Sequence, residues 1–413
     1  MKISYKLIVF LILAMLASFC ITCDFAIIKP ASSSIFISKY GASNIPYAWL
    51  AVIPLNLFIV NGYNWLLPRF GCVRLFLGTT LFVAGMNLFT GFFAGSYAWL
   101  PFVQYVLKDI YVLLMFQQIW SVIHVTIKMN EAKYLYGLIF GVGGLGAVLG
   151  SYITKSFAVG LGSEHLLFAT IPIYTSFIAI YLLLVKVSQW NTGANELTVL
   201  QKEKKEDRGG FKKIYASRYL QYILCIVVSM QLTATVVEYQ FNMYLESAFP
   251  VQDVRTSFTG MLFGYVNLAT VLFQFVGSTI FIHFLGVLRS HVLIPCGLSI
   301  LAGCNILLPS FSMVAATFGS IKSLDYSIFR ILTEMLYIPL STEEKFSAKA
   351  VIDVFAYRTA RGIASILVIG LQGIAPLFID STLKMGAFVV LLVWIIATFG
   401  IARESQRFQE KPA

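Results

Sequence analysis

Long apolar runs alternate with short polar segments along most of the chain. Because about 20 helical residues are needed to cross a ~30 Å hydrocarbon core, runs of this length predict membrane-spanning helices. We therefore predict an all-α membrane protein with twelve transmembrane helices. The runs cover residues 7–28, 47–67, 73–94, 98–123, 136–158, 166–187, 219–241, 257–282, 289–308, 311–338, 351–373 and 383–402.

One long hydrophilic segment, WNTGANELTVLQKEKKEDRGGFKK at residues 190–213, interrupts this pattern after the sixth run. Its charged and small polar residues are typical of a solvated linker without chemistry of its own. The pattern therefore predicts an N-terminal six-helix bundle at residues 1–187 and a C-terminal six-helix bundle at residues 218–413. A cytoplasmic linker at residues 188–217 joins them.

A short repeat supports two related halves. The turn PRFGCVR at residues 68–74 follows the second run, and HFLGVLR at residues 283–289 follows the eighth. Each turn has one glycine and a closing arginine, at the same place in its six-helix half. This favours a parallel repeat, the arrangement of the major-facilitator fold.

The composition agrees with a polytopic membrane protein. The chain has 413 residues, of which 58% are hydrophobic and 12% charged, and its mean hydropathy is +0.81. A soluble core cannot bury that much apolar surface, whereas a protein surrounded by a lipid bilayer requires it. The net charge of +11 is spread over short segments between apolar runs, so we predict no nucleic-acid partner.

Lysine and arginine are concentrated on one side of the predicted helices, which orients a membrane protein with that side in the cytoplasm. We therefore predict that both termini are cytoplasmic. As separate predictions, the membrane is a bacterial inner membrane and the protein is a monomer. The cytoplasmic set is Lys2, Lys6, Arg69, Arg74, Lys128, Lys133, the cluster at residues 202–218, Arg289, Lys345, Lys349, Arg403, Arg407 and Lys411. The opposite side has few basic residues, including Lys39, Lys155, Arg255 and Lys384.

The first twenty residues, MKISYKLIVFLILAMLASFC, resemble a secretory or lipoprotein signal. However, Phe19 stands where a small residue should precede a lipid-modified cysteine, and the apolar run continues to Ile28. A retained first membrane helix is therefore favoured over a cleaved signal.

Cys20 and Cys23 have CxxC spacing without a second ligand pair, which favours core packing over a metal or redox site.

Glycines at four-residue spacing predict close helix packing. Two such pairs are Gly137 with Gly141 and Gly146 with Gly150, and a third is Gly260 with Gly264. Small residues at this spacing let helix backbones approach each other in lipid. The run GVGGLG around Gly144 resembles a dinucleotide loop, but no strand precedes it, so we reject a nucleotide-binding loop.

Ionisable residues inside the apolar runs are the main functional signal, because a charge at the bilayer centre usually faces a bundle interior or a watery cavity. Arg330 and Glu334, and likewise Lys322 and Asp325, are spaced to pair within one helix. Internal ion pairs that only join helices are one interpretation. The other is that unpaired cations line a cavity for an anion. The predicted substrate-binding residues are Lys29, Lys108, Asp109, Glu238, Lys322, Arg330, Arg358 and Arg361.

Of these, the strongest candidates to bind an anion are Lys108, Lys322 and Arg361. A structural role is more consistent with Arg330, Glu334 and Asp353, which lie nearer the cytoplasmic end.

The sequence has no recognisable set of catalytic residues. The four histidines are scattered, and no Ser-His-Asp set, metal-ligand spacing or Walker loop occurs. We therefore predict that the protein is a secondary carrier and not an enzyme. We also predict that it binds no cofactor and no metal.

Three segments resemble the ATP/ADP translocases of intracellular bacteria and plastids. EMLYIPLSTEEKFSAKAVIDVFAYR at residues 334–358 is similar to that family's signature region. WSVIHVTIKMNEAKYLYGLIFGVGG at residues 120–144 and ATVVEYQFNMYL at residues 234–245 match it more weakly. The resemblance implies a twelve-helix major-facilitator fold, exchange of nucleotides or related anions, and a role for Glu238, which matches the family's seventh-helix glutamate.

The sequence departs from the family pattern at three positions. The family's first-helix Arg-x-x-Lys-Asp falls on residues 29–33, where Lys29 keeps a cation but Ser32 and Ser33 replace the lysine and aspartate. Thr333 stands in place of the tenth-helix lysine. Two cations that the resemblance implies for a polyphosphate are thus absent. We predict a transporter of a nucleotide or another anionic metabolite; the alternative is a transport-inactive receptor or scaffold of the same fold.

Overall fold

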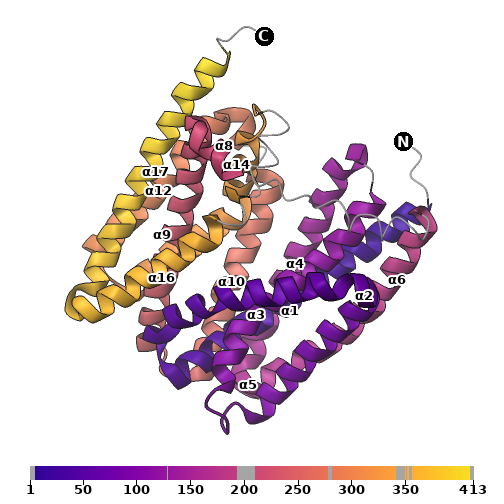
Figure 1. The fold of residues 1–413 in the computed structure, drawn as a ribbon. Helices are drawn as coiled ribbons and strands as arrows, with labels where there is room; N and C mark the ends of the chain where they lie inside the picture. Colours follow the sequence, from indigo (N-terminus) through magenta and orange to yellow (C-terminus); the bar gives the residue numbers. More distant parts are fainter. Residues whose placement is uncertain are drawn as a thin grey trace. The chain divides into compact units, whose positions relative to one another are not determined.

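The computed structural model describes residues 5–127, 129–192, 210–277, 281–340, 349, 351–352 and 356–409 (Figure 1). Helices dominate this part of the chain, and no strand occurs in it. Residues 193–209 of the predicted linker, Lys128, Lys345 and Asp353 lie outside the described residues.

Nine helices in the described part are long and apolar enough to cross a membrane. One of them, α2 (Ile45–Phe93), contains two predicted spans, because its backbone is non-helical at Gly71. The two remaining predicted spans are also helical but are shorter or more polar. They correspond to α13 (Phe311–Leu324), the π-helical turn η5 (Asp325–Phe329) and α14 (Arg330–Leu336), and to α16 (Tyr357–Ile374).

The chain forms two compact units. Unit 1 comprises residues 1–44, 51–205 and 249–268, and unit 2 comprises residues 45–50, 206–248 and 269–413. The predicted division at residues 187 and 218 stays a prediction.

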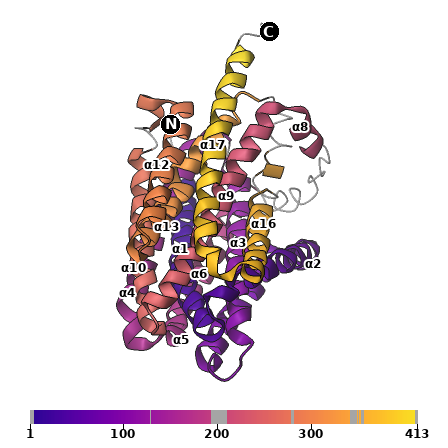
Figure 2. The same cartoon turned by 90° about the vertical axis from the view of Figure 1, so that its left-hand side faces the viewer.

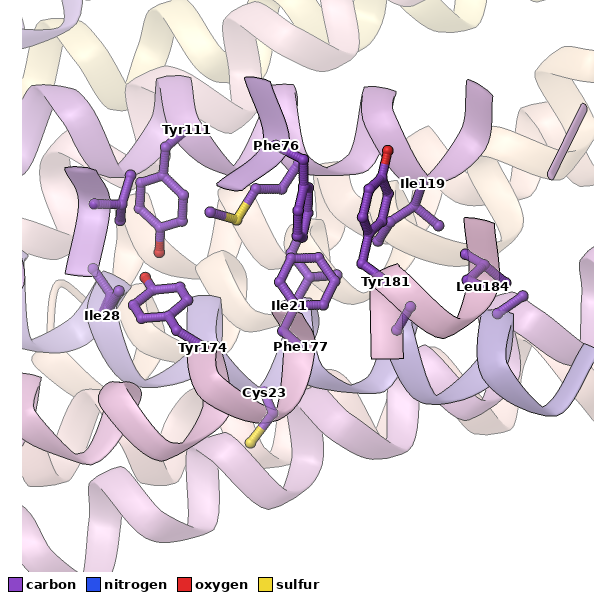
Figure 3. Close-up of a cluster of buried hydrophobic side chains, with 14 of the residues drawn as sticks. Ile21, Cys23, Ile28, Phe76, Tyr111, Ile119, Tyr174, Phe177, Tyr181 and Leu184 are labelled. Carbon is purple, nitrogen blue, oxygen red and sulfur yellow. The ribbon is translucent and has the colours of Figure 1, made fainter. Parts of the chain in front are cut away.

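In unit 1, α1 (Tyr5–Tyr40) packs against α3 (Leu100–Thr126), α4 (Met129–Leu161), the short α5 (Ser163–Leu166) and α6 (Thr170–Thr192). The apolar core of unit 1 includes a group of aromatic rings (Figure 3). The ring centres of Phe76 and Tyr181 lie 3.7 Å apart in a stacked arrangement, and the ring of Phe177 packs edge-on against that of Phe76.

The α1–α4 contact depends on glycines of α4. A Cβ atom on Gly146 would lie 2.3 Å from the Phe19 carbonyl oxygen, and one on Gly150 would lie 2.2 Å from that of Cys23. The predicted close approach at this pair is therefore confirmed. In contrast, a Cβ on Gly137 would meet nothing within 4 Å, so the prediction of a close approach at that position is wrong.

Unit 2 is built around α9 (Arg218–Ala248), which packs against α13, α14, α16 and α17 (Ile379–Gln409). Figures 1 and 2 show α17 alongside α9, and α12 (Val287–Leu307) packs against α17. A further long helix is α10 (Gln252–Leu272), most of which belongs to unit 1. The remaining elements of the two units are short. They are η1 (Ala42–Asn44), η2 (Leu167–Ala169), α8 (Gly210–Ala216), the π-helical turns η3 (Phe273–Gly277) and η4 (Phe281–Leu285), and η7 (Pro376–Phe378).

The repeated turns have the same backbone conformation. Gly71 has φ 76° and ψ 162°, and Gly286 has φ 75° and ψ 165°. A positive φ strains any residue with a Cβ atom, which explains why each turn has glycine at this position. This agreement adds a structural match to the sequence repeat.

We expect Gly71→Ala and Gly286→Ala each to destabilise the protein by about 1–3 kcal/mol, because a positive φ combined with an extended ψ is essentially restricted to glycine. The thermal unfolding midpoint of the detergent-solubilised protein measures this. Gly78→Ala is the matched control, since Gly78 has no positive φ and a Cβ there would meet nothing within 4 Å. An equal midpoint for all three variants would contradict the strain argument.

Candidate functional site

The predicted site residues divide between the two units. Lys29, Lys108 and Asp109 lie in unit 1, and the other five lie in unit 2. The structure brings three of the five together. They are Glu238 of α9, Lys322 of α13 and Arg361 of α16.

The Glu238 carboxylate is the centre of this cluster. Its Oε2 atom accepts a hydrogen bond from Lys322 Nζ at 2.8 Å and lies 3.5 Å from an Nη atom of Arg361. The side chains of Glu238 and Lys322 are each 10% exposed, whereas that of Arg361 is 32% exposed. The guanidinium is thus the most accessible of the three groups.

Helical spacing explains how α9 meets α13. Gln231 and Glu238 are seven residues apart, which is two turns of one helix face. Lys322 and Asp325, three residues apart, share a face of the partner segment. Glu238 accepts from Lys322, and Gln231 donates to the Asp325 carboxylate at 3.1 Å. The π-helical turn η5 begins at Asp325, and such turns are frequent at functional sites.

The ring of Trp49 lies against Arg361, the third residue of the cluster. The Arg361 guanidinium lies 4.8 Å from the centre of the Trp49 ring, which is within cation–π range. Trp49 is 1% exposed and belongs to the start of α2, which clusters with unit 2. Sequence reasoning did not identify Trp49, because no periodicity connects it with α16, which lies about 310 positions further along the chain.

Two cations contact the same carboxylate in this cluster. Lys322 and Arg361 both pair with Glu238. Electrostatic interactions are stronger in a low-dielectric interior than in water. This arrangement can attract an anion to the partly exposed side of Arg361.

The prediction that Lys108, Lys322 and Arg361 are unpaired is wrong. Lys322 and Arg361 both contact Glu238, and Lys108 Nζ lies 3.5 Å from the carboxylate of Asp109. Lys108 is 2% exposed, and its ammonium group also donates to the Tyr105 carbonyl at 3.0 Å. A nearby carboxylate offsets part of the cost of burying each cation.

The other predicted site residues have different surroundings. Lys29 is half-buried, with its ammonium 4.3 Å from the centre of the Phe263 ring. Arg358 is half-buried, one turn before Arg361 on α16. Arg330 is exposed at the start of α14.

Glu334 pairs with Lys349, at 2.6 Å, with both side chains more than a third exposed. The sequence spacing suggested Arg330 as its partner. An exposed pair of this kind contributes little to stability or binding. The structural role predicted for Glu334 stays a prediction.

Unit 1 contains a second buried polar group, Asp24 of α1. The hydroxyls of Tyr111 and Tyr174 donate to its Oδ2 atom at 2.7 and 3.0 Å, and Figure 3 shows the two hydroxyls directed toward one another. Asn87 donates to the Tyr174 hydroxyl at 3.2 Å and accepts from Gln104 at 2.7 Å. These bonds form a continuous polar chain between α1, α2, α3 and α6.

This chain reaches a cavity of about 220 Å³ between α2 and α3. Asn87, Gln104, Lys108 and Tyr111 are its main polar lining residues, and the remaining lining residues are almost all apolar. Its apolar lining and the pairing of Lys108 with Asp109 make this cavity a weaker anion site than the Glu238 cluster. Among the described residues, no group of three histidine, cysteine, aspartate or glutamate side chains could bind a metal ion.

The apolar helices of membrane-spanning length define a polytopic membrane protein, and unit 2 contains a buried ionic cluster. The fold is similar to that of solved transporters. The nucleoside transporter NupG superposes with a TM-score of 0.70 at 8% identity, covering 95% of this chain and 99% of that one. A D-xylose-proton symporter gives a TM-score of 0.62 at 12% identity, covering 96% and 97% of the two chains. The predicted major-facilitator fold is confirmed.

The chain belongs to the TLC ATP/ADP transporter family, whose sequence model matches residues 79–405. The predicted family resemblance is therefore confirmed. ADP,ATP carrier protein 1 of Rickettsia typhi is 24% identical over 327 residues, which is 70% of this chain and 65% of that protein. ADP,ATP carrier protein 1 of Chlamydia trachomatis is 24% identical over 348 residues, covering 74% and 66%. The chain thus matches just under two thirds of each relative's length.

Proposed function

We propose that the protein is a secondary-active carrier that moves a nucleotide or a related anionic metabolite across a membrane by alternating access. The observation that supports this most directly is the buried carboxylate of Glu238, which two cations share. Relatives in the family are called ADP,ATP carriers, which favours a phosphorylated nucleotide as the substrate class.

Glu238 is suited to act as an internal counter-ion. In the absence of substrate, its carboxylate compensates Lys322 and Arg361, so neither cation is buried without a partner. A phosphate oxygen of the substrate can replace the carboxylate on one or both cations, beginning at the more exposed Arg361. Charge-assisted hydrogen bonds to phosphate then replace those to Glu238.

The departures from the family pattern favour a substrate that is less charged than ATP. Thr333 is 7% exposed, and its hydroxyl donates to the Phe329 carbonyl at 2.8 Å, while Ser32 is fully buried. Each missing lysine removes a charge-assisted contact of about 1.5–3 kcal/mol. Among nucleotides we therefore expect those with fewer phosphate charges to compete best.

Orientation and assembly are part of the same proposal. The distribution of lysine and arginine supports cytoplasmic termini, and the bacterial relatives support the inner membrane as the location. A two-bundle carrier with one site per chain can function as a monomer. The predicted six-plus-six division and the eight predicted binding residues belong to this proposal too.

Uptake of labelled ATP, ADP, NAD and nucleoside monophosphates into proteoliposomes tests the function. We expect saturable uptake of at least one of them, with a rate that rises when the vesicles contain unlabelled substrate. Unlabelled competitors then rank the substrates by affinity. If no nucleotide is transported but one still raises thermal stability by binding, the result would support the receptor alternative.

A further inference from the structure

Unit 2 contains a cavity that shares no lining residue with the Glu238 cluster. Its volume is about 450 Å³, and its walls come from the start of α9, the turn before α12 and the end of α14. That turn is the repeated HFLGVLR segment, to which the candidate site gives no role. The lining residues are Tyr219, residues 285–289, Met335, Leu336, Ile338 and Pro339.

The cavity lies where a membrane-spanning helix begins. The first residue of α12 is Val287, and this helix is long and apolar enough to cross a membrane. With 21 residues, α12 has about the length that the hydrocarbon core requires. Its first turn therefore lies near the boundary between hydrocarbon and water, at the level of the phospholipid head groups.

One side of the cavity is suited to a phosphate group. Arg289 is exposed and is the only charged side chain among the described lining residues. The first turn of α12 begins at Gly286, which has no side chain to cap it, and the first intrahelical donor is Ser290, whose N–H bonds the Gly286 carbonyl at 3.2 Å. The N–H groups of residues 287–289 thus have no intrahelical partner, and a helix N-terminus attracts negative charge. A guanidinium binds phosphate through charge-assisted hydrogen bonds.

The other side of the cavity is apolar and continues onto the surface. Leu285, Leu288 and Met335 line it. Ile338, also in the lining, is 63% exposed, and Phe284, next to Leu285 in the chain, is 74% exposed. A soluble anion would leave these side chains uncovered, whereas an acyl chain covers them. The cavity therefore combines a cationic end with an apolar end, as an amphiphilic ligand requires.

A hydrogen bond between two of the helices holds the walls together. The Tyr219 hydroxyl donates to the carbonyl of Leu336 at 2.8 Å, and Tyr219 is 3% exposed. Leu336 is the last residue of α14, where the final carbonyls have no partner within the helix. This bond fixes the end of α14 against α9. A preformed site loses less conformational freedom when a ligand binds.

We propose that this cavity binds an anionic phospholipid of the surrounding bilayer. The phosphate lies against Arg289 and the first turn of α12, and an acyl chain lies against Leu285, Leu288 and Ile338. The proposal concerns a site separate from the candidate transport site and does not depend on the proposed function. No acidic side chain is among the described lining residues, so the charge of Arg289 favours an anionic over a zwitterionic head group.

Native mass spectrometry of the purified full-length protein, titrated with phosphatidylglycerol or phosphatidylcholine, tests the site through the Kd of the first bound lipid. We expect phosphatidylglycerol to bind at least tenfold more tightly, and Arg289→Gln to weaken its binding at least tenfold. Arg74→Gln is the matched control, because Arg74 is the exposed closing arginine of the other repeated turn and does not line the cavity. We expect less than a twofold effect for it. Equal Kd values for the two lipids, or equal effects of the two substitutions, would overturn the proposal.

A second pair of variants tests the apolar side. We expect Ile338→Ser to weaken phosphatidylglycerol binding at least threefold. Ile366→Ser should change it less than 1.5-fold, since Ile366 is similarly exposed, at 61%, but lies on α16 outside the cavity. Equal effects of these two variants would contradict an acyl-chain contact.

Glycerol 3-phosphate, which has the phosphate without acyl chains, distinguishes a phospholipid from a soluble phosphate compound. We expect it to bind at least 100-fold more weakly than phosphatidylglycerol. If it binds as tightly, the cavity is a site for a free phosphate group and the phospholipid proposal is overturned.

Discussion

Replacing Lys322 by glutamine is expected to lower the initial rate of substrate uptake about 10- to 100-fold. A hydrogen bond to a charged group contributes about 1.5–3 kcal/mol, and each 1.4 kcal/mol corresponds to a factor of ten. Lys322 is buried, and its ammonium lies 2.8 Å from the Glu238 carboxylate. Glutamine keeps a hydrogen-bond donor but removes the charge that an anionic substrate needs.

The measurement is uptake into proteoliposomes at equal amounts of folded protein, verified by size-exclusion chromatography. Lys349→Gln is the matched control, because it removes a lysine from an ion pair of similar length, 2.6 Å to Glu334, whose side chains are 39% and 48% exposed. We expect less than a twofold effect, since exposed pairs contribute little. Similar losses for both variants would contradict a specific role of Lys322.

Adding one methyl group at Gly150 is expected to destabilise the protein more than an alanine at any open glycine of the same helix. The Cβ atom of Gly150→Ala would lie 2.2 Å from the Cys23 carbonyl oxygen and 2.9 Å from the Ala26 side chain. The obstructing atom belongs to a helix backbone, so α1 and α4 must move apart. Overpacking of this kind costs about 1–3 kcal/mol and occasionally more.

The thermal unfolding midpoint and the yield of monodisperse protein measure this effect. Gly137→Ala is the control on α4, because a Cβ there would meet nothing within 4 Å. Alanine is favoured over glycine in a helix by about 1 kcal/mol, so this variant should be as stable as the parent or more stable. A Gly150→Ala protein with an unchanged midpoint would contradict the close α1–α4 packing.

The two predictions concern different kinds of contact. The glycines of α4 determine how closely α1 and α4 approach each other. A side chain added at Gly146 or Gly150 would collide with backbone atoms of α1. The Glu238 cluster instead contains groups that can exchange one ionic partner for another without leaving a charge uncompensated. A carrier needs both kinds, because its helices must remain packed while its binding groups change partners.

The sequence predicted the general architecture well, for a clear physical reason. Membrane-spanning helices must satisfy their own backbone hydrogen bonds and expose apolar side chains to lipid, so each one appears as a continuous apolar run. The positive φ of Gly71 and Gly286 likewise agrees with a repeat that was visible in the residues alone. The predicted number of twelve spans includes α13 and α16, whose charged residues weaken the apolar signal.

The order of residues alone therefore predicted the class of fold, the family, and the set of intramembrane charges from which a site could be built. Which of these charges meet depends on the packing of the helices. The tertiary structure placed Lys322 and Arg361 on the same carboxylate, paired Lys108 with Asp109 and Glu334 with Lys349, and put Trp49 over Arg361. Local spacing constrains neighbours within one helix, whereas partners on different helices depend on how those helices pack, which no single apolar run specifies.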